Sequence, residues 1–346
     1  MNKPSIYGIH RVLKPQGVLP QAASKIDNTM ICGENEILVQ VERLNIDSAS
    51  FTQIKNATAG DFDKMKEMIQ GIVSEKGKMQ NPVTGSGGMF LGTVKEIGKD
   101  LNIDLKPGDK IASLVSLSLT PLKIEKIISI DLHKDQVDIV GEAILFESGI
   151  YAKIPSDLPE NLVLSALDVA GAPAQVKNLV KENDTVLILG ASGKSGTLCA
   201  YQSRINAGNK GFVIGIIHSQ SHYEEMESLG IFDKIIVADA RNPIEVLEKV
   251  LNATGGKLVD VTINVVNVEN TEMSSILPTK DSGIVYFFSM ATSFTKAALG
   301  AEGIGKECTM VIGNGYTKGH AELTLNLLRE SKILFDLFQK RYGKEE

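Results

Sequence analysis

The chain has 346 residues, of which 43% are hydrophobic and 23% are charged, and its formal net charge at pH 7 is −6. These values are ordinary for a globular protein, and the length allows two domains with separate cores. The negative charge, the absence of Trp and an aromatic content of 5% argue against a nucleic acid as the main partner.

The sequence contains no run of the roughly 18 apolar residues that a membrane span needs, and its first residues form no apolar signal region. Its three cysteines, Cys32, Cys199 and Cys308, lie far apart without any C-x-x-C pair. Such a sparse set is typical of a reducing compartment and offers neither a disulfide framework nor a zinc lobe. We therefore expect a cytoplasmic protein that has no membrane partner.

The first half of the chain has mainly β patterns. Residues 36–46 alternate well enough to form a half-buried strand. Residues 61–77 place apolar side chains at helical spacing and end in glycine, which predicts an amphipathic helix. Between residues 83 and 115, strand-like pieces are separated by glycine and Pro-Gly turns, and further short pieces follow to residue 155. This pattern is typical of a small β-barrel.

From residue 162 onward, predicted helices and strands alternate strictly. Such alternation indicates an α/β domain with a doubly wound parallel sheet. The last predicted helix is amphipathic and long enough to pack back on the first domain. The expected strands are 186–189, 211–217, 234–237, 259–266 and 283–289, and the expected helices include 163–180, 221–229, 243–251 and 320–342.

A glycine-rich turn connects one of these strands to a helix. Val186–Leu189 is short and apolar, and Gly190, Gly193 and Gly196 follow at three-residue spacing before a helical pattern. This order of strand, turn and helix is the context of a dinucleotide-binding fingerprint, in which backbone amides and the helix N-terminus attract a pyrophosphate. The spacing is G-x-x-G-x-x-G, which also occurs in turns that bind no ligand, so that alternative stays open.

Two motifs together resemble the medium-chain dehydrogenase/reductase superfamily. Residues 92–98 and 106–111 look like its barrel signature, and residues 184–196 look like its cofactor turn in the style of the quinone reductases. The resemblance covers residues 36–346. It implies a GroES-like β-barrel catalytic domain at 1–158, a Rossmann NAD(P)-binding domain at 159–307, and a C-terminal segment at 308–346 that returns to the catalytic domain.

Departures from the superfamily pattern narrow the choice of activity. The zinc-dependent members carry a Cys near the positions of Asp47 and Ser48, and a Gly-His-Glu motif near residues 85–87. This chain has neither, and it lacks the four-cysteine block that holds a structural zinc. Without a thiolate and an imidazole at these places a tetrahedral zinc site has no ligands, so we expect a zinc-free member with no metal residues.

A closer resemblance spans the whole chain. It is carried by residues 7–23, 44–51 and 168–173, which are similar to the family of L-erythro-3,5-diaminohexanoate dehydrogenases. The resemblance implies oxidative deamination of that diamino acid to 5-amino-3-oxohexanoate, with release of ammonia and reduction of NAD or NADP, in anaerobic lysine fermentation. Two alternatives stay open: a zinc-free NADPH-dependent quinone or enoyl reductase, and a protein that keeps the cofactor fold for binding alone.

The expected cofactor site combines the glycine turn with the carboxyl ends of the later strands, where ligands bind in such sheets. Lys194 has an alternative as a solvated turn lysine, His218 as the exposed end of a strand, and Asn267 as a turn former. The full set is Gly190, Ser192, Gly193, Lys194, Ser195, Gly196, His218, Ser219, Val265, Val266, Asn267, Ser289 and Met290.

The sequence favours neither NAD nor NADP clearly. In NAD enzymes a carboxylate usually follows the second strand of the sheet and binds the ribose hydroxyls. Here no acid occurs after Ile217 until Glu224, and no arginine stands nearby in the sequence to hold a 2′-phosphate. We expect NAD as the cofactor, with NADP possible.

The chemistry needs a base for the substrate ammonium and polar groups for its carboxylate and second ammonium. Asp47 and Ser48 stand where the resemblance places the catalytic centre, although Asp47 could equally cap a helix. Tyr316, Lys318 and His320 belong to a glycine-rich loop that resembles the one closing the cleft, although a helix-start loop explains them too. We further expect a homodimer, joined at an edge strand formed by residues 283–289.

Overall fold

The computed structural model describes residues 4–132, 134–313 and 315–343. The chain divides into two compact units, with the boundary between Leu164 and Ser165. The boundary expected from the sequence lies six residues earlier, after residue 158, and residues 308–313 and 315–343 group with the second unit.

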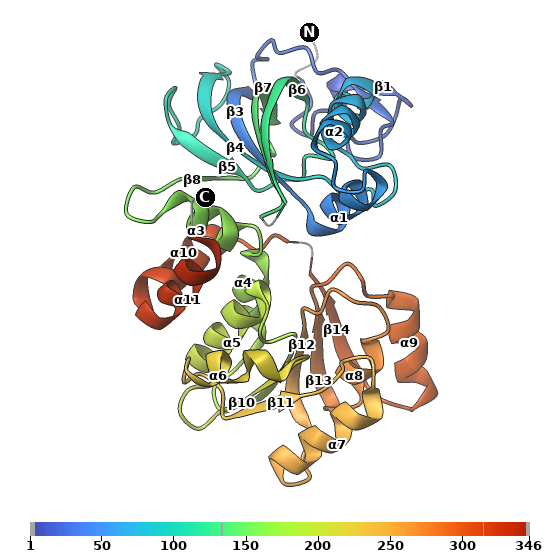
Figure 1. The fold of residues 1–346 in the computed structure, drawn as a ribbon. Coiled ribbons are helices and arrows are strands. Elements are labelled where there is room, and N and C mark those ends of the chain that lie inside the picture. The colour runs from blue at the N-terminus through green and yellow to red at the C-terminus, as the bar shows by residue number, and fades with distance from the viewer. Residues whose placement is uncertain (1–3, 133, 314, 344–346) are drawn as a thin grey trace. The chain divides into compact units, whose positions relative to one another are not determined.

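The first unit is built on a six-stranded antiparallel sheet with the order β6-β7-β3-β4-β5-β8 (Figure 1). A small two-stranded sheet, β1 (Val12–Lys14) with β2 (Lys25–Ile26), and the helices α1 (Ser48–Ala57) and α2 (Phe62–Lys76) accompany it. The six strands are β3 (Glu36–Ile46), β4 (Gly88–Ile97), β5 (Lys110–Ser113), β6 (Leu122–Asp131), β7 (Gln136–Phe146) and β8 (Tyr151–Lys153).

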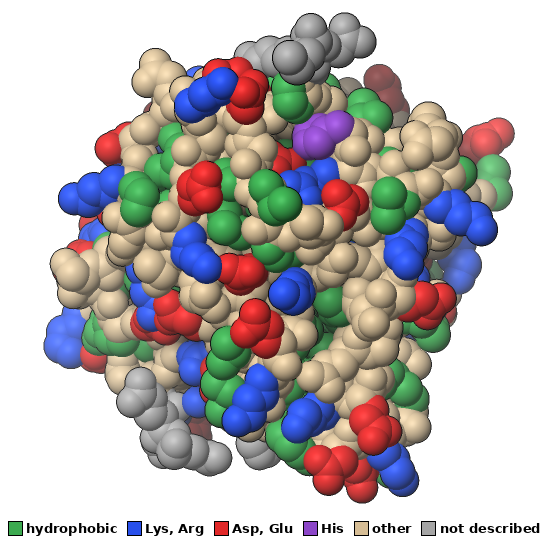
Figure 2. Space-filling model, turned by 90° about the horizontal axis from the view of Figure 1, so that it is seen from above, with side chains coloured by type: hydrophobic (Ala, Val, Ile, Leu, Met, Phe, Trp, Pro, Cys, Tyr) green, Lys and Arg blue, Asp and Glu red, His purple; other side chains and the backbone are tan. Residues whose placement is uncertain are grey.

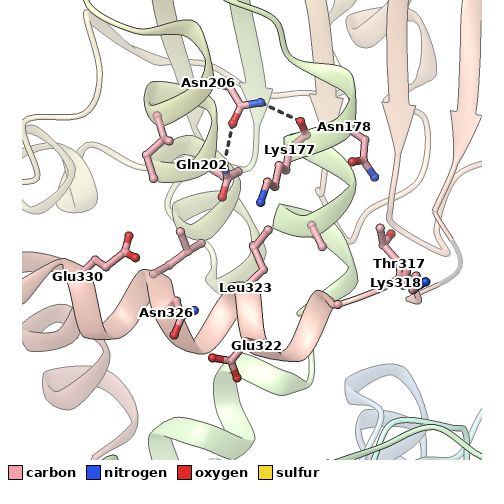
Figure 3. Close-up of a pocket in the computed structure, with 14 residues that line it drawn as sticks. Lys177, Asn178, Gln202, Asn206, Thr317, Lys318, Glu322, Leu323, Asn326 and Glu330 are labelled. Atoms are coloured by element: carbon pink, nitrogen blue, oxygen red, sulfur yellow. Dashed lines mark hydrogen bonds between the residues drawn. The ribbon is translucent and has the colours of Figure 1, made fainter.

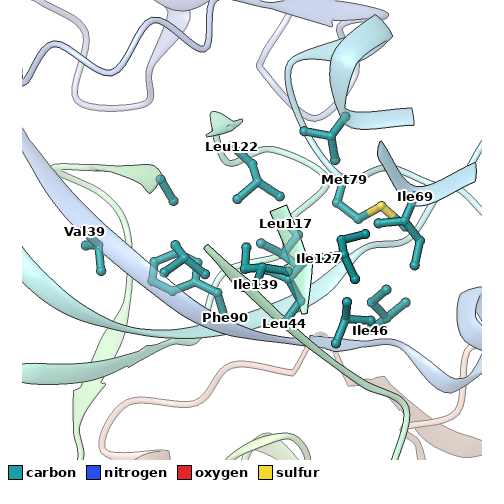
Figure 4. Packing of buried hydrophobic residues seen from close by; sticks show 14 of the residues in the cluster. Val39, Leu44, Ile46, Ile69, Met79, Phe90, Leu117, Leu122, Ile127 and Ile139 are labelled. Carbon is teal, nitrogen blue, oxygen red and sulfur yellow. The ribbon is translucent and has the colours of Figure 1, made fainter. Parts of the chain in front are cut away.

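The core of this unit gathers inward-facing side chains from the curved sheet and the two helices. Val39, Leu44 and Ile46 of β3 pack there with Phe90 of β4 and Ile69 of α2 (Figure 4). The predicted helix is confirmed with its caps: Asp61 accepts a hydrogen bond from the Lys64 amide at 3.0 Å, and Gly77 adopts a left-handed conformation with φ 76°.

The second unit is a six-stranded parallel sheet with the order β11-β10-β9-β12-β13-β14 (Figure 1). The doubly wound sheet expected from the alternation is therefore confirmed. The strands are β9 (Thr185–Leu189), β10 (Phe212–Ile217), β11 (Lys234–Val237), β12 (Val259–Asn264), β13 (Thr279–Phe287) and β14 (Cys308–Ile312). The helices are α3 (Glu160–Leu167), which crosses the unit boundary, α4 (Gly171–Leu179), α5 (Lys194–Ala207), α6 (Tyr223–Glu227), α7 (Pro243–Thr254), α8 (Glu272–Ile276), α9 (Phe294–Gly303), α10 (His320–Glu330) and α11 (Lys332–Tyr342).

Strand β9 shows why the central strands are apolar throughout. Val186 and Ile188 pack in one cluster with residues of α4 and α5, whereas Leu187 and Leu189 pack in another with residues of α7. Because helices cover both faces of a parallel sheet, successive side chains are buried on opposite sides.

Two of the expected long helices are each divided in two. The helix expected at 163–180 becomes α3 and α4, since Pro173 is tolerated in the first turn of α4 but would break the interior of one continuous helix. The helix expected at 320–342 breaks at Ser331, whose extended backbone and hydroxyl cap α11 by accepting from the Leu334 amide at 3.2 Å. Both C-terminal helices pack within the second unit, against α4, α5 and Glu225.

The predicted edge strand was wrong. Residues 283–287 lie in β13, which is paired on both sides, and the edge is β14, which pairs with β13 in parallel register. Strand β14 was not predicted from the sequence, because it is only five residues long and lacks an alternating polar pattern.

The molecular surface carries charges of both signs. On the face shown in Figure 2, Lys and Arg side chains are interspersed with Asp and Glu. Among the described residues, no helix is both long enough and apolar enough to cross a bilayer.

Candidate active site

The glycine turn after β9 has the backbone geometry that a dinucleotide site requires. Gly190 has φ 85°, a conformation that side chains other than glycine rarely adopt. A Cβ atom on Gly196 would lie 2.1 Å from the Gly190 carbonyl oxygen, so only glycine lets α5 start this close to the turn. A Cβ on Gly193 would meet nothing nearer than that oxygen, at 3.4 Å. A turn that accepts only glycine at these positions fits a nicotinamide dinucleotide, because the pyrophosphate of such a cofactor must come close to the backbone of the turn.

Helix α5 points its N-terminus at the turn. Within the described part of the chain, the amides of Ser192 and Ser195 donate to no backbone partner, whereas the Gly193 amide binds Gly190 O at 3.0 Å. Amides at the N-terminus of a 14-residue helix form a ready anion site. The backbone around Ser192 and Ser195 is therefore suited to hold the cofactor's pyrophosphate.

Two cations lie at the turn, and both are held by acids. Lys194 is not the solvated turn lysine that seemed an alternative: its Nζ donates to Asp168 Oδ2 at 2.6 Å and lies 5.7 Å from the centre of the Tyr342 ring. Arg341 of α11 donates to Ser192 O at 2.8 Å and pairs with Glu225. Arg341 could not be found by sequence reasoning because only the packing of α11 brings it to the turn.

The other predicted cofactor residues follow the carboxyl ends of neighbouring strands, as expected. Val265, Val266 and Asn267 come after β12, and Asn267 is exposed. The buried amide of Asn264 shapes this loop, since it accepts from the Val266 amide at 3.1 Å and donates to Thr271 and Ser275 hydroxyls, both at 2.9 Å. No sequence pattern singles out Asn264, because a polar residue at the end of a buried strand can equally begin a turn.

Beyond β13 and β10, the remaining predicted residues also lie at this edge of the sheet. Ser289 Oγ accepts from the Ala291 amide at 3.1 Å, and Met290 is 73% exposed. After β10, Ser219 accepts from the Ser221 amide at 3.3 Å, and its hydroxyl is 2.8 Å from that of Ser221. His218 stands between β10 and this turn.

In the first unit, Asp47 directly precedes α1 but does not cap it through its side chain. Its Oδ2 accepts instead from the Gly87 amide at 3.0 Å. The neighbouring Ser48 hydroxyl donates to Asp135 Oδ2 at 2.8 Å. Asp47 is therefore the N-cap residue of α1 by position, but its side chain makes no capping hydrogen bond, and the carboxylate is tied to the loop formed by residues 81–87.

A cluster of hydroxyl groups joins that loop to α1. Ser50 Oγ, which is fully buried, lies 2.5 Å from Thr84 Oγ1 and 2.6 Å from Ser86 Oγ. Asn81, also buried, accepts from the Val83 and Thr84 amides and donates to Gln53 at 2.7 Å. These contacts fix the loop against α1, so the position of Asp47 is set by several hydrogen bonds. The sequence analysis missed Ser50 and Asn81.

Tyr316 and His320 lie together in the second unit. Their rings meet edge to face with centroids 5.2 Å apart, at the start of α10. His320 is buried, and burial lowers its pKa, although the backbone contact with Thr317 acts in the opposite direction. Tyr316 is 45% exposed. Of the four predicted catalytic residues, Tyr316 and His320 thus contact each other in the second unit, whereas Asp47 and Ser48 lie in the first unit. Asn314 of the same loop lies outside the described residues.

A groove of about 550 Å³ on the second unit does not coincide with this site. It lies between α4, α5 and α10, and its lining includes Lys177, Gln202 and Glu322 (Figure 3). Of the residues that the sequence singled out for the site, Lys318 lines it and the others do not. In the described parts of the chain, no group of three or more His, Cys, Asp or Glu side chains is arranged to hold a metal ion.

The arrangement of an antiparallel-sheet unit followed by a unit with a six-stranded parallel sheet is also the fold of solved quinone oxidoreductases. The quinone oxidoreductase of Coxiella burnetii has the same fold, with a TM-score of 0.57 and 20% identity over 90% of this chain and 84% of its own. A mycobacterial protein solved as a complex with NADPH matches with a TM-score of 0.54 and 17% identity, over 93% of this chain and 85% of its own.

Sequence relatives specify the family. The L-erythro-3,5-diaminohexanoate dehydrogenase of Acetoanaerobium sticklandii is 60% identical over 97% of this chain and 98% of its own length. That of Fusobacterium nucleatum is 58% identical over 99% of this chain and 100% of its own. Residues 10–155 match the family model for the N-terminal domain of L-erythro-3,5-diaminohexanoate dehydrogenase. The chain therefore belongs to the L-erythro-3,5-diaminohexanoate dehydrogenase family.

Proposed function

We propose that this protein oxidises L-erythro-3,5-diaminohexanoate at the amine on carbon 3, giving 5-amino-3-oxohexanoate and ammonia. The observation that carries the proposal is the identity of 58–60% with two relatives of that name over nearly the whole chain. The structure of the glycine turn supports it, because the reaction needs a dinucleotide as electron acceptor.

The reaction balances as follows. The substrate ammonium loses a proton to a base, the carbon–hydrogen bond at carbon 3 breaks with transfer of a hydride, and an iminium forms on the substrate. Water adds to that carbon, and the carbon–nitrogen bond breaks to leave the ketone and ammonium. One proton is released in total. The cofactor, when bound, accepts the hydride.

Asp47 is our candidate for the base. Its carboxylate is oriented by the Gly87 amide, and the hydroxyl cluster of Ser50, Thr84 and Ser86 holds the loop that carries this amide. A base must be held within hydrogen-bond reach of the proton that it takes, and a carboxylate fixed by a backbone amide meets the positional requirement. Ser48 is proposed as a neighbouring polar contact for the substrate, and Tyr316 and His320 are weaker candidates from the second unit.

The first experiment follows the absorbance of reduced nicotinamide with 3,5-diaminohexanoate as substrate, and assays ammonia in the same cuvette with and without a strong chelator. We expect one ammonia per reduced cofactor and no effect of the chelator, in keeping with the zinc-free expectation. Absence of turnover with both NAD and NADP would overturn the substrate proposal. Loss of turnover with the chelator would overturn the zinc-free proposal.

The role of Asp47 is tested by Asp47→Asn. We expect kcat to fall roughly 10²- to 10⁴-fold, the contribution typical of a positioned general base. Asp63→Asn is the matched control, since Asp63 lies in the first turn of α2 and carries no such role. If Asp47→Asn keeps more than a tenth of the wild-type kcat, another group is the base.

The alternative of a quinone or enoyl reductase rests on likeness of fold alone, at 15–20% identity. It predicts NADPH-dependent reduction of quinones or enones, without any dependence on ammonium. We propose NAD as the main cofactor, with NADP accepted, and a cytoplasmic enzyme of anaerobic lysine fermentation.

We also infer a homodimer, now placed at β14. This edge strand presents Thr309 and Ile312 as exposed residues, and Ile312 is 55% exposed. A strand that pairs on one side only and carries an exposed apolar side chain is suited to pair with a second copy about a twofold axis. Light scattering on a sizing column should give a dimer for the wild type and a monomer for Ile312→Lys. Ile205→Lys, at a site 50% exposed on α5, is the control that should stay dimeric.

A further inference from the structure

Two neighbouring strands place a charged pair beside the expected position of the adenosine ribose. In the parallel register, Ile217 of β10 lies beside Val237 of β11, so the segments that follow these strands emerge side by side. The ribose of a dinucleotide lies beyond the second strand of such a unit, which here is β10. His218 and Ser219 follow β10, and Asp239 and Arg241 follow β11.

This placement corrects the sequence-based view that no arginine is nearby. Arg241 lies 24 positions after Ile217 in the chain, but it follows β11, the strand that pairs with β10. Hydrogen bonds from the side chain and backbone of Arg241 lower the pKa of the Asp239 carboxyl to about 2, and the charge of His218 contributes to this shift. An electrostatic effect of His218 on Asp239 supports the view that the two segments lie close together.

Asp239 holds Arg241 through several contacts. Arg241 Nε lies 3.0 Å from Oδ1 and 3.1 Å from Oδ2, Nη2 donates to Oδ2 at 2.7 Å, and the Arg241 amide donates to Oδ1 at 2.9 Å. Nη1 has no hydrogen-bond partner among the described residues. The side chain of Arg241 is 58% exposed and that of Asp239 36%. Such an exposed pair contributes little net stability, so Arg241 can take a stronger anion at little cost.

Asp239 is poorly available for ribose hydroxyls while it is bound in this way. Its two oxygens already accept four hydrogen bonds from Arg241. Selection for NAD normally uses a carboxylate that is free to accept from those hydroxyls. A guanidinium with a free nitrogen, in contrast, is well suited to bind a phosphate.

We propose that Arg241, which Asp239 holds in the absence of a phosphate, is the residue that recognises the 2′-phosphate of NADP and so sets the preference between the two cofactors. Its free Nη1 edge and the Ser219 hydroxyl provide the donors for the phosphate oxygens. With NAD, the Asp239–Arg241 pair stays closed and the ribose hydroxyls face His218 and Ser219. This inference rests on the proposed nicotinamide site, and it adds the determinant of selectivity.

The test compares kcat/KM for NADP and for NAD, with 3,5-diaminohexanoate saturating, in the wild type, Arg241→Gln and Asp239→Asn. Arg241→Gln should lower the NADP-to-NAD ratio at least tenfold. Asp239→Asn should raise that ratio through a higher kcat/KM for NADP, with kcat/KM for NAD unchanged, because it releases the guanidinium. Lys332→Gln removes one member of another exposed pair, Lys332–Asp336, and should leave the ratio unchanged.

Two results would overturn the inference. The first is an equal effect of Arg241→Gln on both cofactors, or none. The second is a selective loss of NAD activity in Asp239→Asn, which would make Asp239 the ribose acceptor. Fluorescence titration of the same variants with NADPH and NADH needs no turnover. It therefore separates a failure of this inference from a failure of the proposed substrate: selective weakening of NADPH in Arg241→Gln would support the inference even if the diamino acid is not turned over.

Discussion

A methyl group added at Gly196 tests whether the glycine turn forms the cofactor site. In Gly196→Ala the new Cβ would lie 2.1 Å from Gly190 O and 2.8 Å from Ala191 Cα. An ordinary non-bonded contact is roughly 3.5 Å, so α5 and the turn must separate by about 1.4 Å. A displacement of that size at a reacting centre costs about 10²-fold in rate, and overpacking of this kind costs ~1–3 kcal/mol.

We therefore expect kcat/KM for the cofactor to fall about 100-fold in Gly196→Ala. The melting temperature should fall by ~2–4 °C for each kcal/mol lost in a unit of this size. Steady-state kinetics and calorimetry measure the two effects.

Two matched variants separate the causes. In Gly193→Ala the new Cβ has only a contact of 3.4 Å, so the melting temperature should stay unchanged while cofactor affinity falls, since the methyl group occupies space that the pyrophosphate needs. In Gly71→Ala, in the interior of α2, the new Cβ meets nothing within 4 Å, and stability should rise by up to about 1 kcal/mol. Wild-type cofactor affinity and melting temperature in Gly196→Ala would refute the reasoning.

Three further predictions concern the two units. Glu36 is buried, and although burial raises its pKa, the hydrogen bonds and charge of Arg11 outweigh this and lower it. Glu36→Gln removes the nearest acid from the buried Arg11 and leaves only Asp27 among the described residues, at 3.9 Å, so it should cost ~3–5 kcal/mol of unfolding free energy in urea titration. A loss below 1 kcal/mol would show that the Arg11–Glu36 pair contributes little. The pKa of Glu36 in the folded protein lies below the unfolded value of 4.5. The ionised carboxylate therefore stabilises the fold above pH 4.5, and this stabilisation is lost as the pH falls through the folded pKa. Glu36→Gln should make the free energy of unfolding less dependent on pH in this acid range. His320 is a base, and its pKa in the folded protein lies below the unfolded value of 6.5. The unfolded chain therefore takes up the proton first, and the free energy of unfolding falls as the pH drops below that value. His320→Asn should reduce this dependence on pH, as measured by urea midpoints between about pH 7.5 and 5.5. Asn264→Ala should free the loop after β12 and weaken cofactor binding in fluorescence titration, and an unchanged affinity would show that this loop does not contact the cofactor.

Local patterns predicted most of the elements correctly. The apolar run of β9 and the glycines after it identified the strand, the turn and the start of α5, because φ above zero at Gly190 and close packing at Gly196 both require glycine. Asp61 and Gly77 marked the ends of α2, because their own backbone and side-chain geometry forms the caps. Such features depend on neighbours within a few residues, and sequence reasoning handles them well.

Contacts between distant segments could not be predicted. Asp168 meets Lys194 across 26 positions, and Arg341 meets Ser192 across 149. The position of β14 at the edge of the sheet could not be predicted for a related reason. Whether a strand lies at an edge depends on which strands pair with it, and β14 pairs with β13 on the outer side.

The sequence by itself determined the alternation of strands and helices, the glycine turn and the absence of zinc ligands at the expected positions, since these follow from residue type and short spacing. Only the tertiary structure decided that the Gly87 amide holds Asp47 and that Arg241 stands beside the end of β10. The physical reason is that sheet register and helix docking, which depend on the whole core, determine which distant side chains come within hydrogen-bond distance.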